Sequence, residues 1–119
     1  MPNYSIEESA LVVRDSFTHA ELWRGKVRAQ ACLKCAAIPG SDDAVLLVEP
    51  GSKGGLLFEN LFRVRSNGEI VWAASTRASH DSFVDFSLAI DGLRASTWTG
   101  WRKTLCIESG KIISDQFVK

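Results

Sequence analysis

The residues with the clearest potential for chemistry gather around one short turn. Trp98 and Trp101 flank a Thr-Gly pair, and Arg102 and Lys103 follow directly. Tryptophan beside arginine is the composition of protein-binding hot spots and of cation–π stacking. The turn therefore predicts a recognition site. The alternative is structural: Trp98 would pack in a core and Trp101 would cap a sheet edge, with arginine stems covering the rings.

Three further arginines extend the recognition hypothesis. Strand alternation places Arg94 on the same face as Trp98, and it places Arg63 and Arg65 together on one face of an earlier strand. If the two strands are neighbours, their sheet carries a face of arginine and tryptophan. The candidate binding residues are Arg63, Arg65, Arg94, Trp98, Trp101, Arg102 and, from the motif described next, His80.

The segment Ser79-His80-Asp81-Ser82 contains the residue types of a hydrolytic triad. Adjacent residues cannot converge as nucleophile, base and orienting group, and the sequence has no Gly-x-Ser-x-Gly turn. We interpret the segment as a solvated loop in which His80 is the best candidate for a titrating role. Asp42 or Asp43, in a Pro-Gly turn, would be its only plausible acid–base partner. No catalytic residue is assigned.

The cysteines do not form a convincing metal site. Cys32 and Cys35 make a single CxxC pair, whereas a structural zinc needs four ligands, and only Cys106 and two isolated histidines remain. On a regular strand the two thiols point to opposite faces, with Cys35 on the apolar one. We therefore expect structural thiols, no bound metal and no cofactor.

Composition excludes several classes of protein. The 119 residues suit a single domain, and the 14 basic and 14 acidic side chains cancel. Nucleic-acid binders usually carry a basic excess, so we expect no nucleic-acid partner. No apolar run approaches the roughly 18 residues of a membrane span, so we expect no membrane partner either. An odd number of cysteines behind an N-terminus without signal-peptide features predicts reduced thiols in the cytoplasm.

The elements that must position these residues are strands. Side chains alternate between apolar and polar along several segments, and Gly-containing turns recur near residues 67, 91, 100 and 109. The continuous apolar run 44–48 predicts a central strand covered on both faces. We predict an all-β fold, an antiparallel meander of about eight to ten strands in an open twisted sheet or a β-sandwich. The predicted core residues are Val45, Leu47, Phe62, Val64, Ile70, Trp72, Val84, Phe86, Leu88, Ala95, Leu105 and Ile113.

The second half of the chain contains an internal echo. Residues 60–72 read as a strand, a Gly turn and a strand ending in Trp, and residues 102–113 repeat the strand, Gly turn and strand. Residues 60–118 resemble a blade repeat of quinoprotein-type β-propellers, which implies a propeller-blade-like second half. A closed ring needs more blades than this chain can hold. The NLFRV and GEIVW segments also resemble a group of small bacterial proteins; small proteins of that kind include immunity proteins that block a toxin.

Together these observations predict a small cytoplasmic protein-binding module without catalytic activity, of the immunity or inhibitor type, with a protein partner. We also expect a homodimer, because open sheets leave edges that pairing can cover. One alternative is a β-sandwich protein that binds a small molecule in an apolar cavity ringed by Trp72, Trp98 and Trp101. A small hydrolase-like enzyme is the second alternative.

Overall fold

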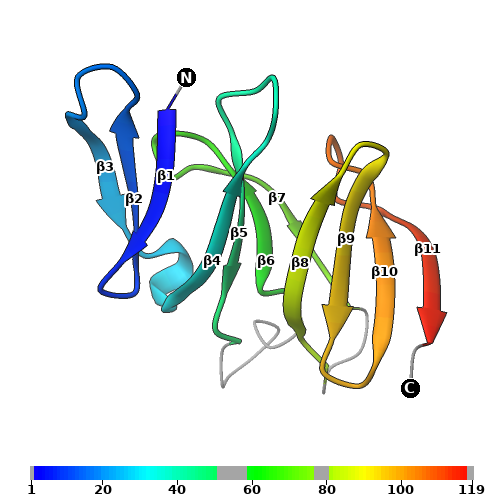
Figure 1. Ribbon diagram of the computed structural model, residues 1–119. Helices are drawn as coiled ribbons and strands as arrows, with labels where there is room; N and C mark the ends of the chain where they lie inside the picture. The colour runs from blue at the N-terminus through cyan, green and yellow to red at the C-terminus, as the bar shows by residue number, and fades with distance from the viewer. Residues whose placement is uncertain (1, 51–58, 77–80, 118–119) are drawn as a thin grey trace.

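The computed structural model describes residues 2–50, 59–76 and 81–117, and strands dominate it (Figure 1). Its strands are β1 (Pro2–Glu7), β2 (Ala10–Asp15), β3 (Glu21–Gly25), β4 (Cys32–Ala37), β5 (Ala44–Val48), β6 (Leu61–Val64), β7 (Ile70–Ala74), β8 (Phe83–Ala89), β9 (Gly92–Thr97), β10 (Trp101–Leu105) and β11 (Ile112–Phe117). One 3-10 turn, η1 (Val27–Ala29), precedes β4. In the described ranges, no helix is long and apolar enough to cross a membrane.

The strands form three open antiparallel sheets. The first sheet has the order β1-β2-β3, the middle sheet β4-β5-β6-β7 and the third sheet β11-β10-β9-β8. Neighbours in each sheet are also neighbours in the chain, and all pairs are antiparallel. The predicted all-β antiparallel meander is therefore confirmed. The middle and third sheets each have the four-stranded meander of a propeller blade.

The middle sheet is a shared layer between two cores. Along β5, Ala44, Leu46 and Val48 face the first sheet, whereas Val45 and Leu47 face the third. All five side chains are buried. The continuous apolar run thus gives a strand covered on both faces, as the sequence predicts, because neither face of β5 reaches water.

Most of the predicted core residues are buried, two lie at the margins of the cores and two are exposed. Ile70 and Leu88 pack at the margins of the cores, while Val84 and Ile113 are exposed, which corrects the prediction for these two. The reason is a β-bulge beside each of them. The register shifts between Phe83 and Asp85, so Phe83 turns inward and Val84 outward. A second shift leaves Ile113 without a partner on β10, and Ile112 packs in its place.

A third bulge corrects the prediction for the CxxC pair. The register shifts between Cys32 and Lys34, so that Leu33 is unpaired and half-exposed. Cys32 is consequently buried, and Cys35 packs against the same core rather than pointing to the opposite face. Burial raises the pKa of the Cys35 thiol to about 11. Neither thiol forms a disulfide bond.

Tryptophan–glycine contacts join each sheet to the next. The ring of Trp23 on β3 lies against Gly68 in the β6–β7 turn, and the ring of Trp72 on β7 lies against Gly110 in the β10–β11 turn. Trp72 also donates its indole N–H to the Ile107 carbonyl oxygen at 2.6 Å. The two halves of the sequence echo therefore occupy equivalent places, the last hairpins of consecutive sheets.

Candidate functional site

The third sheet turns one face toward the middle sheet and the other outward. The outer β8–β11 face, as we call it, is polar and holds two of the candidate arginines. In the strand register Arg94 lies opposite Ser87 on β8, and Arg102 lies opposite Ser96 on β9. The side chains of all four, together with Asp85, line a shallow depression of about 240 Å³. The structure thus brings Arg94 and Arg102, two of the candidate binding residues, onto one surface.

The two arginines differ in their partners. Arg94 pairs with Asp91 at 3.1 Å, an exposed contact within one turn. Among residues 2–50, 59–76 and 81–117, no carboxylate lies within ion-pair distance of the Arg102 guanidinium. Arg102 is thus available to a carboxylate outside this part of the chain.

The outer β8–β11 face also lacks the tryptophan that joins one sheet to the next. Trp72 is the fourth residue after Gly68, and the fourth residue after Gly110 is Ser114. Ser114 is exposed on β11 opposite Thr104. The outer β8–β11 face therefore occupies the place where a further sheet would pack, but its side chains are polar and able to form hydrogen bonds.

Trp98 lies at one end of this face, in the β9–β10 turn, and 77% of it is exposed. The interpretation of Trp98 as a core residue is therefore wrong. Its turn is nevertheless held firmly by Asp81, which is only 3% exposed. The Asp81 carboxylate accepts hydrogen bonds from the Thr99 backbone N–H at 3.1 Å, the Thr99 hydroxyl at 2.7 Å and the Ser82 N–H at 2.9 Å.

The electrostatics of Asp81 suit this anchoring role. Burial by itself raises the pKa of the carboxyl, but the hydrogen bonds from Thr99, Thr97 and Ser82 outweigh it and hold the pKa below its usual range. Thr97 extends the network, since its hydroxyl accepts the Trp101 N–H at 3.1 Å. Asp81 thus belongs to the site as an ionised anchor, although the sequence pointed instead to its neighbour His80.

Trp101 is in a different environment from Trp98. Its ring packs edge-on against Phe117 on β11 with centroids 5.3 Å apart, and the Lys103 ammonium lies 5.5 Å from its centre. Lys103 is itself buried and pairs with Asp115 at 2.8 Å. The edge-capping interpretation describes Trp101 well, although 39% of the residue is still exposed.

The structure does not bring Arg63 and Arg65 to the outer β8–β11 face. Arg63 belongs to β6 of the middle sheet, so the expected neighbourhood with the strand of Arg94 is wrong. The Arg63 side chain is 15% exposed and donates to the Asp43 carboxylate at 2.9 Å and to the Ile107 carbonyl oxygen at 3.1 Å. Arg65 is exposed just before the β6–β7 turn. Pairing with Arg63 also gives Asp43 a structural role.

Two other expectations concern His80 and a cavity ringed by tryptophans. His80 lies outside the described residues, so its expected role stays a prediction. Among the described residues, Trp72 is buried between the middle and third sheets while Trp98 is exposed, so these rings do not face one common cavity. The described residues also contain no cluster of His, Cys, Asp and Glu side chains that could hold a metal.

A groove that the sequence analysis does not predict lies at the other end of β9. It has a volume of about 570 Å³ and adjoins a more apolar hollow of about 460 Å³. Both spaces are lined by Ile38, Pro39, Ile90 and Ile107, which come from three separate turns. We call this feature the Ile90 groove. Only the tertiary structure brings these turns together, so no local sequence signal could have revealed it.

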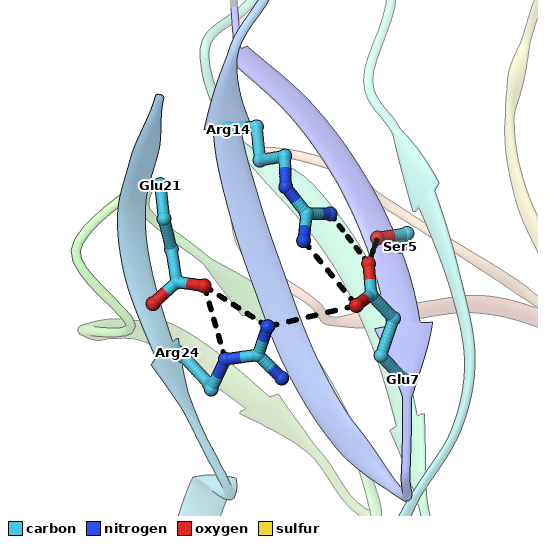
Figure 2. Close-up of polar contacts among 5 residues, drawn as sticks. All are labelled: Ser5, Glu7, Arg14, Glu21 and Arg24. Carbon is cyan, nitrogen blue, oxygen red and sulfur yellow. Dashed lines mark hydrogen bonds and ion pairs between the residues drawn. The ribbon is translucent and has the colours of Figure 1, made fainter. Parts of the chain in front are cut away.

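A second polar cluster covers the outer face of the first sheet (Figure 2). Arg14 binds the Glu7 carboxylate through both terminal nitrogens, and Arg24 lies between Glu21 at 2.9 Å and Glu7 at 3.5 Å. These four side chains pair with one another, and Val12, which lies opposite Arg24 on β3, is fully buried. We interpret the cluster as a cover for the sheet rather than as a binding site.

No protein-family model matches this sequence, and no curated protein is significantly similar to it.

Proposed function

We propose that this chain is a protein-binding module without a catalytic step, and that it contacts its partner through the Trp98 turn and the outer β8–β11 face. The observation that carries the proposal is the exposure of Trp98 on a turn anchored by buried Asp81. A tryptophan in a rigid turn loses little conformational entropy when it binds. Such a side chain gives a large contact area for a partner.

The surface beside Trp98 also contains the residue types that are common in binding interfaces. Arg102 lacks an ionic partner among the described residues, and Arg94 keeps only an exposed one. Arginine and tryptophan together are enriched among residues that dominate binding energy. The partner surface that fits this combination offers an apolar pocket flanked by carboxylates.

The finer parts of the proposal are an immunity or inhibitor type of action and a cytoplasmic location. The free thiols of Cys32, Cys35 and Cys106 support a reducing compartment. An inhibitor of a second protein would need a firm surface and no reaction chemistry of its own. That requirement agrees with the anchored turn.

The decisive experiment is affinity capture from the native host with matched variants, followed by a binding measurement with the purified partner. We expect Trp98→Ala to weaken binding by about 2 kcal/mol or more and Arg102→Gln to weaken it less, while both variants stay folded. Arg65→Gln is the control, because it removes an exposed arginine from a different sheet. The proposal fails if Trp98→Ala binds every captured protein as tightly as the unmodified chain does.

A further inference from the structure

We propose that the Ile90 groove binds a second copy of this chain, so that the protein forms a dimer with two-fold symmetry. Ile90 precedes β9 and Trp98 follows it, so the two surfaces lie at opposite ends of that strand. Self-association through the groove would leave the Trp98 turn open. The inference is therefore independent of the proposed partner surface.

The first argument is that the region contains both a projecting apolar side chain and a space for one. Ile90 is fully exposed, at 110% of its reference accessibility, at the tip of the β8–β9 turn. Beside it, Ile38, Pro39 and Ile107 line both spaces, and exposed Ile113 lines the larger one together with polar residues such as Ser41 and Asp91. An exposed apolar patch of this kind marks an interaction site. In a two-fold dimer one patch faces its own copy, so each Ile90 can enter the groove of the other chain.

The second argument is charge complementarity beside the groove, because Glu108 lines it and Lys111 follows Glu108 by three residues in the same turn. Glu108 and Lys111 are both exposed in the β10–β11 turn, and neither has an ion pair within the described ranges. The nearby carboxylate of Asp91 is already occupied by Arg94. Around a two-fold axis, the β10–β11 turns of the two chains lie face to face in opposite directions. Glu108 of each chain can then pair with Lys111 of the other. This region thus carries an apolar projection, a hollow beside it and one charge of each sign.

Sedimentation velocity and light scattering over a wide concentration range test the proposal. We expect the mass of the unmodified chain to approach twice 13.1 kDa as concentration rises. Ile90→Lys should raise the dimer dissociation constant by about tenfold or more, because it places a charge in each apolar hollow. Trp98→Lys is the matched control: it makes the same kind of change at the opposite end of β9, and it should leave the dimer intact.

The charges of Glu108 and Lys111 allow a second test that does not depend on Ile90. Glu108→Lys and Lys111→Glu should each weaken the dimer, because each variant sets like charges against one another. The double variant, Glu108→Lys with Lys111→Glu, should restore it. A monomer mass at every concentration overturns the proposal. So does a dimer that survives Ile90→Lys unchanged, or one that is lost only on Phe117→Lys, since that pattern would indicate pairing through the β11 edge.

Discussion

At the residue scale, the two tryptophans of one turn have different roles because their contacts differ. The side chain of Trp98 is exposed, whereas the ring of Trp101 packs against Phe117 and lies near the Lys103 ammonium. We expect Trp98→Ala to change the free energy of unfolding by less than about 0.5 kcal/mol. Trp101→Ala should lower it by about 1–2 kcal/mol through loss of the ring contact and the cation–π contact. Chemical denaturation of both variants measures the difference, and equal losses would contradict it.

Asp81 should make the free energy of unfolding depend on pH in the acidic range. Its pKa is lower in the folded chain than in the unfolded one, so the ionised carboxylate stabilises the fold above its unfolded pKa of about 4. That contribution is lost as pH falls through the folded pKa. Asp81→Asn should cost about 1–3 kcal/mol at neutral pH and flatten the fall in stability below about pH 4. Thermal melts across pH test this, and an unchanged acid limb in the variant would assign the effect to other carboxylates.

At the element scale, the glycine turns show how one sheet is fitted to the next. Gly110 has φ of +74°, and a Cβ there would lie 2.5 Å from the Trp72 ring. Gly40 has a similar φ of +77° but open space around it. Gly40→Ala should therefore cost only the backbone strain of about 1 kcal/mol. Gly110→Ala should cost clearly more, because Trp72 must also move.

Calorimetric or denaturant unfolding of Gly110→Ala and Gly40→Ala gives the comparison directly. The intrinsic tryptophan fluorescence of the Gly110→Ala variant should also change, because the substitution displaces the Trp72 ring. Equal costs for the two substitutions would show that the contact between the turn and the ring contributes nothing to stability.

The ion pairs on the outer face of the first sheet should be detectable in a pH titration of the Glu7 carboxyl. The hydrogen bond from Arg14 holds the pKa of the Glu7 carboxyl at about 2, and the nearby Arg14 and Arg24 charges act in the same direction. Because the folded pKa is depressed, the contact stabilises the fold at neutral pH and is lost only in strong acid. Carbon-detected NMR should show Glu7 titrating near this value. Arg14→Gln should move its pKa back toward about 4.3, and an unmoved titration would contradict the pairing.

At the scale of the whole molecule, the shared middle sheet couples the two cores. Leu46 faces the first sheet and Leu47 the third, although they are adjacent on β5. Leu46→Ala and Leu47→Ala should each cost about 2–5 kcal/mol and shift a single unfolding transition. Far-ultraviolet circular dichroism and tryptophan fluorescence should then report the same midpoint. Two separated transitions in either variant would show that the outer sheets unfold independently.

The sequence by itself determined what local chemistry controls. Alternation and Gly turns predicted the antiparallel meander, the run 44–48 predicted a strand buried on both faces, and Arg94 was placed correctly on an outer face. These features follow from side-chain periodicity and turn geometry within a few residues of chain. The echo between residues 60–72 and 102–113 likewise marked two equivalent hairpins.

Only the tertiary structure decided which strands share a sheet and which residues each bulge turns over. A bulge adds one residue to one strand, so it exchanges inward and outward positions without leaving a signal in the alternation; Val84, Ile113 and Leu33 show the result. Contacts between distant segments were equally hidden, since Arg63 pairs with Asp43 rather than joining Arg94. The Ile90 groove is made by three turns that approach one another only when the middle and third sheets pack. Such packing depends on the complementarity of whole faces, and no stretch of the sequence records that complementarity locally.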